Sequence, residues 1–244
     1  MAYKIIIIFF MSVIIFTKLT LAADEIDSFK SSPEGSLSNI GKSKYNKSNN
    51  YMAVTADHRA TKSAIRILEL GGTAIDAAIS AQMVLNLVEP QSSGIGGGGF
   101  ILYYDAKTRN IYAWDGREKA PMNFSESVFL NSDGKKKGFI EAVSGGLAVG
   151  VPSLVTMLEK AHEVHGNMQW KLLFEDSIKL STEGFIVGKR LSKLTSRAPH
   201  LKNQNTAREY FNIDNGGLQE GKLKKNLKFA HTLKLIRDNG SKAM

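Results

Sequence analysis

Hydrophobic residues recur at helical spacing over two neighbouring segments of the chain. Residues 58–70 place alanines and large aliphatic side chains on one helical face, and a Gly-Gly pair follows them, as is typical of a helix C-terminus. Residues 74–88 are apolar on nearly all sides, which predicts a buried helix. Thr73 and Asp76 have the spacing of a capping box at the start of that helix. We therefore expect a helix pair whose second member lies in the core.

Strand patterns follow the helix pair. Residues 100–104 and 110–114 are rich in aliphatic and aromatic side chains and are separated by a short polar segment, which predicts a hairpin. The glycine-rich segment 94–99 precedes the hairpin and predicts a tight backbone turn. Residues 52–55 also resemble a short strand.

Helical patterns return in the second half of the chain. Pro152 begins a predicted helix that ends before Gly166, and further helices are predicted over residues 170–182 and 226–237. Because helices and strands do not alternate strictly, this order favours an α+β fold with an antiparallel sheet over a doubly wound parallel sheet.

Residues 1–22 have the layout of a signal peptide. A positive residue precedes an apolar run, 5–16, which is too short to span a bilayer because a spanning helix takes about 20 residues. Small residues precede a cleavage point after Ala22. We expect a periplasmic or secreted protein with no stable membrane span after cleavage; an uncleaved membrane anchor is the alternative. Residues 23–50, rich in Ser, Asn and Lys, are predicted to be a flexible leader, and 51–244 the folded domain.

Composition adds two constraints. The chain of 244 residues contains no Cys, which excludes a disulfide framework, a thiolate nucleophile and Cys-ligated metal sites. The net charge of +9 belongs to residues 189–244, which hold 13 Lys and Arg against 4 Asp and Glu. This segment has few aromatic residues and no nucleic-acid motif, so we predict a solvated face and no nucleic-acid partner.

The glycine segment contains the spacing G-x-G-x-x-G at Gly94, Gly96 and Gly99. A dinucleotide site needs a strand before this turn and a helix after it. Here a predicted helix precedes the turn and a predicted strand follows it, so we expect no nucleotide there, and no cofactor is predicted elsewhere. Two interpretations stay open, a close approach of the backbone to the core and a run of backbone amides beside a small-molecule site.

Two other groups of polar residues have candidate chemistry. His162 and His165 lie one turn apart on a predicted helix, but their spacing is one residue short of the metalloprotease motif H-E-x-x-H. We therefore predict exposed helix residues and no metal site. Arg117 follows the second hairpin strand directly, between Gly116 and Glu118. Its planar guanidinium suits a substrate carboxylate, and a salt bridge within the turn is the alternative.

Five short motifs follow one another along the chain. They are GGTAIDAA at 71–78, PQSSGIGGGGF at 90–100, REKAP at 117–121, GVP at 150–152 and EGFIV at 183–187. In this combination and order they resemble the γ-glutamyltransferases, also called glutathione hydrolases. The similarity covers roughly residues 51–240.

The resemblance implies an N-terminal-nucleophile (Ntn) hydrolase, with antiparallel sheets stacked between helix layers, made as a precursor that cleaves itself into a large and a small subunit. In this family the nucleophile is the N-terminal Thr of the small subunit, whose free amine acts as the base. It attacks the γ-glutamyl amide of compounds such as glutathione, and the γ-glutamyl group passes to water or to an acceptor. By its position in the motif, Arg117 is the substrate-binding residue for the α-carboxylate of that group.

The chain also departs from the family pattern. It ends before the self-cleavage point, so no catalytic residue is predicted in it, and Ser153 replaces the last Gly of the family's G-x-P-G motif. We expect an incomplete αββα sandwich, inactive alone, that either pairs with a separately encoded small-subunit piece or is degenerate. The alternative is an exported, non-catalytic module that binds γ-glutamyl or glutamate carboxylates through Arg117.

Overall fold

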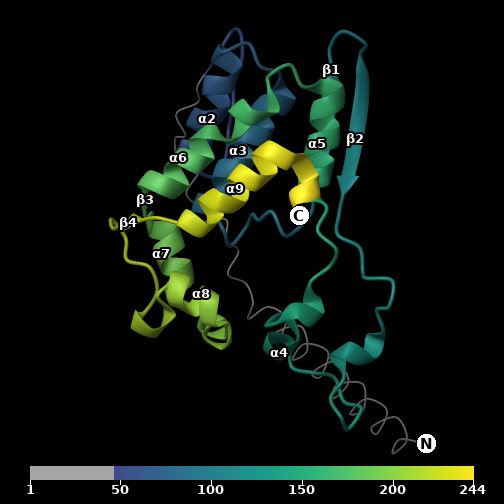
Figure 1. Cartoon of the computed structure of the whole chain (residues 1–244), viewed down its shortest axis with the longest axis vertical. Helices are drawn as coiled ribbons and strands as arrows, with labels where there is room; N and C mark the ends of the chain where they lie inside the picture. Colours follow the sequence, from purple (N-terminus) through teal and green to yellow (C-terminus); the bar gives the residue numbers. More distant parts are fainter. Residues whose placement is uncertain (1–46) are drawn as a thin grey trace, which may run out of the picture. The chain divides into compact units, whose positions relative to one another are not determined.

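The computed structural model describes residues 47–244, and residues 49–244 form one compact unit (Figure 1). The predicted signal peptide and the predicted leader up to residue 46 lie outside the described residues. Within the described part of the chain, every helix is too short or too polar to cross a bilayer.

The described chain combines helices with two small antiparallel sheets, so the α+β prediction is confirmed. The larger sheet is the hairpin of β1 (Gly99–Asp105) and β2 (Asn110–Gly116), and the smaller pairs β3 (Phe185–Ile186) with β4 (Leu223–Lys224). The helices are α2 (His58–Glu69), α3 (Ala74–Val88), α4 (Phe139–Val143), α5 (Leu154–His165), α6 (Glu175–Glu183), α7 (Lys189–Ser196), α8 (Asn205–Tyr210) and α9 (Leu227–Asn239).

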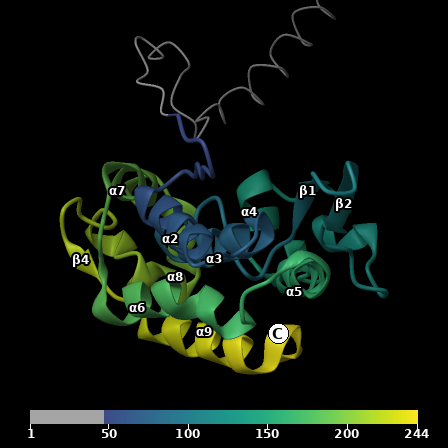
Figure 2. The same cartoon turned by 90° about the horizontal axis from the view of Figure 1, so that it is seen from above.

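Helix α3 is the centre of the core, as its uniformly apolar sequence predicts. It packs against α2, α5 and α6, and α9 covers α6 from the outside (Figure 2). The largest fully buried side chains come from these helices and their connections: Ile67, Ile79, Met83, Leu87, Leu173, Phe174, Leu233 and Ile236. Because the site described below begins on α3, this core fixes one of its walls.

The ends of the first two helices follow the sequence signals. Gly71 has φ +88°, a left-handed conformation that ends α2 and that glycine adopts without strain. The predicted capping box is confirmed, because the Thr73 side chain accepts from the Asp76 amide and the Asp76 side chain accepts from the Thr73 amide.

Asp76 also holds a distant loop against α3. Its Oδ2 accepts hydrogen bonds from the backbone amides of Thr73, Asn167 and Met168 at 2.8, 2.9 and 3.2 Å. The side chain is fully buried. A single carboxylate therefore ties the start of α3 to the connection that follows α5.

Three predictions about secondary structure need correction. Residues 52–55 are not a strand, because no segment of the described chain pairs with them. Helix α5 begins at Leu154 with Ser153 as its N-cap, so Pro152 lies before the helix rather than in its first turn. Residues 170–182 are not one α-helix: a 3-10 helix covers Trp170–Phe174 and α6 follows it.

The β1–β2 hairpin has one packed face and one exposed face. Its inner side chains, such as Tyr103 and Trp114, pack against the core beside α5. Its outer face carries exposed Phe100, Leu102 and Ile111. This exposed face is apolar, although side chains on a solvent-facing side of an antiparallel strand are usually polar.

The N-terminus of α2 makes an acid-sensitive contact. Asp57 caps the helix by accepting from the Arg59 amide and pairs with the Arg59 guanidinium at 2.6 Å. Burial raises the pKa of Asp57, but the hydrogen bonds and charge of Arg59 outweigh burial, so the pKa lies below its ordinary value of 3.8. An acid whose pKa is depressed on folding stabilises the protein above its unfolded pKa, and this stability is lost as the pH falls through the folded pKa.

We expect Asp57→Asn to flatten the fall in stability below about pH 4, because the amide keeps the cap but does not titrate. At neutral pH the same substitution should cost about 1.5–3 kcal/mol, the value of a charged hydrogen bond. Urea titrations across this pH range measure both effects. Parallel curves for the two proteins below pH 4 would contradict the assignment.

Candidate functional site

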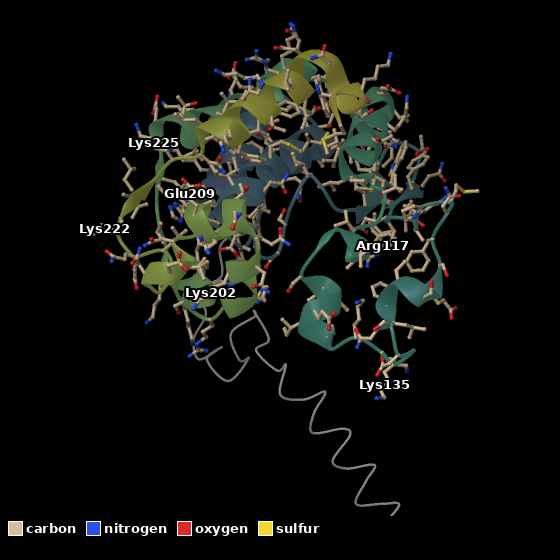
Figure 3. The ribbon with its side chains drawn as sticks, turned by 60° about the horizontal axis from the view of Figure 1, so that its bottom comes forward. Arg117, Lys135, Lys202, Glu209, Lys222 and Lys225 are labelled. Carbon is tan, nitrogen blue, oxygen red and sulfur yellow. The ribbon has the colours of Figure 1, made fainter. Side chains whose placement is uncertain are left out.

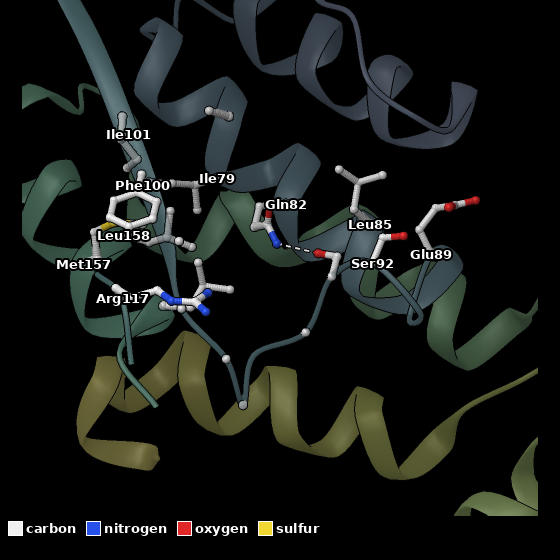
Figure 4. A pocket seen from close by; sticks show the side chains of 18 of the residues that line it. Ile79, Gln82, Leu85, Glu89, Ser92, Phe100, Ile101, Arg117, Met157 and Leu158 are labelled. Carbon is white, nitrogen blue, oxygen red and sulfur yellow. Dashed lines mark hydrogen bonds between the residues drawn. The ribbon is translucent and has the colours of Figure 1, made fainter. Parts of the chain in front are cut away.

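A cavity of about 900 Å³ opens between α3, the glycine segment, the start of β1 and the residues that follow β2 (Figure 4). One wall is apolar and comes from α3 and α5, through Ile75, Ile79, Met157 and Leu158. The polar lining comes from Gln82, Glu89, Ser92, Ser93, Arg117 and Glu118. A concave site with an apolar wall and few polar groups is the usual form of a small-molecule site.

Arg117 is the cationic group of this cavity. It follows the last residue of β2, and its backbone amide donates to Asp115 Oδ1 at 2.9 Å, which fixes the turn at the strand end. Its side chain is 68% exposed, and Nη1 lies 3.3 Å from Glu118 Oε2. In Figure 4 the guanidinium is directed into the cavity, below Phe100. The salt bridge within the turn, the alternative drawn from the sequence, is therefore present, and the role of Arg117 toward a substrate carboxylate stays a prediction.

Glu118 lies against the glycine segment. A Cβ placed on Gly97 would lie 3.1 Å from Glu118 Oε1, and one on Gly98 would lie 2.8 Å from Oε2. A Cβ on Gly150 would lie 2.8 Å from the Glu118 Cβ. The carboxylate thus fits beside Arg117 because three neighbouring positions carry no side chain.

The glycine segment is held by backbone contacts. The Ser153 and Leu154 amides donate to the Gly97 carbonyl at 3.1 and 3.0 Å, and Ser153 Oγ donates to the Gly116 carbonyl at 2.6 Å. Ser153, where the family motif has Gly, therefore connects the start of α5 to the end of β2. The Gly97 amide donates to the Gly94 carbonyl, so this amide is engaged within the turn. Of the two interpretations of the glycine segment, the close approach of the backbone to the core is confirmed, because a Cβ on Gly99 would lie 3.3 Å from Cδ1 of the core residue Leu154. The segment also lines the cavity.

The opposite side of the cavity is fixed by an amide and hydroxyl network. Gln82 Nε2 donates to Ser93 Oγ at 2.6 Å (Figure 4) and to Asn86 Oδ1 at 2.8 Å. Ser93 Oγ donates to Asn86 Oδ1 at 2.6 Å. These bonds hold the start of the glycine segment against α3.

Sequence reasoning did not identify Glu89. This residue ends α3, is buried, and pairs with Arg190 of α7, whose Nη2 also donates to Ser92 Oγ at 3.4 Å. Burial raises the pKa of Glu89, although the charge of Arg190 lowers it in part. The signal that could have identified Glu89 was a single acidic residue directly after the apolar residues 74–88. A carboxylate in such a position is expected to be buried, and a buried carboxylate requires a partner. Its partner could not be found because Arg190 lies far along the chain.

The two histidines of α5 are not the exposed residues that we predicted. His162 is half-buried, with Nε2 2.9 Å from the Met168 carbonyl and 3.4 Å from Asp76 Oδ1. The ring of His165 lies against Tyr103 and Tyr112, with centroids 4.4 and 4.8 Å apart. The two rings have different neighbours. No group of three or more His, Asp or Glu side chains that could hold a metal ion occurs among residues 47–244.

Comparison with known proteins decides the family. The family model described as Gamma-glutamyltranspeptidase matches residues 60–244, well over half of the chain. The chain belongs to the γ-glutamyltranspeptidase family. The "Glutathione hydrolase proenzyme" of Bacillus subtilis (strain 168) is 38% identical over 192 residues, which are 79% of this chain and 33% of that protein. The proenzyme of Escherichia coli (strain K12) is 30% identical over 191 residues, which are 78% of this chain and 33% of that protein.

Solved structures of γ-glutamyltranspeptidases agree with this assignment. The Helicobacter pylori enzyme superposes with a TM-score of 0.77 and 29% identity, covering 82% of this chain and 57% of that one. The Pseudomonas nitroreducens enzyme, complexed with L-DON, gives a TM-score of 0.71 and 31% identity, covering 79% and 56%. The predicted family and its Ntn-hydrolase fold are therefore confirmed. The chain covers the N-terminal part of the family's large subunit and spans about a third of the length of the curated relatives it matches.

Proposed function

We propose that this chain supplies the α-carboxylate anchor of a γ-glutamyl-binding site and that Arg117 is this anchor. The observation that supports the proposal best is the guanidinium at a cavity of about 900 Å³, exposed over 68% of its side chain and paired on one side by Glu118. Its remaining N–H groups suit the two oxygens of a carboxylate. The substrate class is γ-glutamyl compounds such as glutathione.

We propose that the attacking group comes from another polypeptide segment. Among the described residues that line the cavity there is no threonine, histidine or lysine. The lining hydroxyls are those of Ser92 and Ser93, and Ser93 is engaged with Gln82 and Asn86. The chain then binds and orients the γ-glutamyl group, and the N-terminal Thr of a small subunit attacks the amide.

Removing the guanidinium should weaken carboxylate binding. We expect Arg117→Ala to weaken binding of glutamate and glutathione by at least about tenfold, because a charged hydrogen-bonded pair is lost. Arg117→Lys should recover only part of the affinity, since an ammonium lacks the planar fork. Titration calorimetry on the full chain measures this, with Arg208→Ala as control for removal of an exposed arginine that does not line the cavity. Equal affinities for wild type and Arg117→Ala would refute the anchor role.

A second candidate function is a non-catalytic, exported binding module, which the exposed guanidinium also supports. Both functions predict that the chain binds glutamate through Arg117, so turnover has to separate them. We would mix the chain with a γ-glutamyltranspeptidase small-subunit piece and follow release of aniline from a γ-glutamyl anilide. Release that depends on both pieces and on Arg117 supports the enzyme. Glutamate binding without release in any combination supports the binding module.

We also propose that the protein is exported to the periplasm or secreted, on the basis of its first 22 residues. Expression of the complete reading frame should yield a mature protein that begins at Ala23. N-terminal sequencing of the exported protein checks this. An N-terminus at Met1 in a membrane fraction would support the uncleaved anchor instead.

A further inference from the structure

A second cavity lies at the basic end of the molecule and shares no lining residue with the cavity at Arg117. It measures about 730 Å³, within the usual range for small-molecule sites. Its walls come from α8, β4 and the first turns of α9. The residues that decide its chemistry are Glu209, Tyr210, Phe211, Lys224, Lys225, Lys228 and Phe229.

Three lysines and one glutamate line this cavity. Lys224 is half-buried, donates from Nζ to the Tyr210 carbonyl at 2.5 Å and lies 4.1 Å from the centroid of the Tyr210 ring. Burial lowers the pKa of Lys224, while the charge of Glu209 raises it in part. Lys225 and Lys228 are exposed, and within residues 47–244 no acidic side chain pairs with either of them. The cavity therefore carries excess positive charge.

The N-terminus of α9 lies at this cavity and adds to its positive field. Helix α9 begins at Leu227, and Asn226 caps it by accepting from the Phe229 amide at 3.0 Å. Helix N-termini carry a partial positive charge and favour Asp or Glu in the first turn. The first turn of α9 contains no acidic residue, and Lys228 stands there instead. The lysines thus reinforce the helix dipole where side chains usually oppose it.

Aromatic side chains form the other part of the lining. Tyr210, Phe211 and Phe229 are all partly buried, and the rings of Tyr210 and Phe211 contact each other edge to face, with centroids 4.8 Å apart. An inorganic ion would leave this apolar surface unused. A ligand that carries an apolar ring or chain beside its charge would cover it.

We propose that this cavity binds a small organic anion, with a carboxylate or phosphate held by Lys225, Lys228 and the N-terminus of α9. Its apolar body lies against Tyr210, Phe211 and Phe229. This assignment refines the sequence-based picture of residues 189–244 as a uniformly solvated basic face. Lys202 and Lys222, labelled in Figure 3, belong to the same basic segment but are not among the residues that line the cavity. They provide a matched control for net charge.

The test uses phenyl phosphate as the probe and the full chain as the protein. We expect saturable shifts of the aromatic proton signals in NMR titrations. Lys225→Gln/Lys228→Gln should weaken binding at least about tenfold, since two charged contacts are lost. Lys202→Gln/Lys222→Gln removes the same net charge and should change the affinity less than about twofold. All four lysines are exposed, so both variants should keep the wild-type spectrum without ligand.

Two further measurements separate the contributions that the charge and the apolar body of the ligand make to binding. Inorganic phosphate and benzyl alcohol each lack one half of the proposed ligand and should bind at least about tenfold more weakly than phenyl phosphate. Glu209→Gln removes the opposing charge and should tighten binding about twofold. Equal losses in the two lysine variants would mean that binding follows net charge alone, and no saturable shift in the wild type would mean that there is no site. Either result overturns the proposal, and neither affects Arg117.

Discussion

Asp76→Ala is expected to lower the free energy of unfolding by about 3–5 kcal/mol, the largest effect of any single polar substitution that we predict. The carboxylate is fully buried and its Oδ2 accepts from the Thr73, Asn167 and Met168 amides. Alanine removes the common acceptor of these three partly buried amides, and a donor left without a partner inside the protein costs about 1–3 kcal/mol. The start of α3 and the loop after α5 then lose their common anchor. Chemical denaturation of both proteins measures the difference.

The control is Asp133→Ala in an exposed loop. Asp133 has a half-exposed side chain and pairs with Lys135 at 3.0 Å, and such surface pairs contribute little. We therefore expect almost no change in the free energy of unfolding. A comparable loss for both variants would show that removal of negative charge, and not the lost buried hydrogen bonds, explains the effect at Asp76.

Asp76 also shows how far the sequence could predict the fold. The capping box between Thr73 and Asp76 spans three residues, so a local pattern was sufficient to predict it and the structure confirms it. The bonds from Asn167 and Met168 reach across 91 and 92 positions. Local patterns carry no information about contacts at such a separation. Residues 52–55 were predicted wrongly for a related reason, since a strand exists only if a partner strand pairs with it.

In the candidate site, too, local sequence patterns identified some residues and missed those that depend on contacts distant in sequence. Arg117 was identified from its motif and its place after a strand, and its place at the cavity fits that role, while binding itself is still to be measured. The network of Gln82 and Ser93 and the pair of Glu89 with Arg190 were not identified. Those contacts join α3 to segments whose approach depends on the whole core. The charged group on one side of the cavity could thus be predicted from a local sequence motif, whereas the shape of the cavity could not.

The glycine segment lines the cavity and packs closely against the end of the β1–β2 hairpin. None of its glycines has positive φ, so conformational freedom does not explain why glycine is present. The explanation at Gly98 is space. A Cβ there would lie 2.3 Å from the Gly116 carbonyl oxygen and 2.9 Å from the Glu118 backbone nitrogen. At Gly96 a Cβ would meet no atom within 4 Å.

We therefore expect Gly98→Ala to cost about 3 kcal/mol, because the clash is with backbone that cannot rotate away. Gly96→Ala, the same substitution two residues earlier, should change stability by less than about 1 kcal/mol. The first variant displaces the segment that supports Glu118 and Arg117, so glutamate affinity should fall with stability, whereas Gly96→Ala should bind as the wild type does. Denaturation and calorimetry on both variants measure this. If Gly98→Ala were as stable as Gly96→Ala, the close approach of the two backbones would not be what holds the ends of the hairpin together at the cavity.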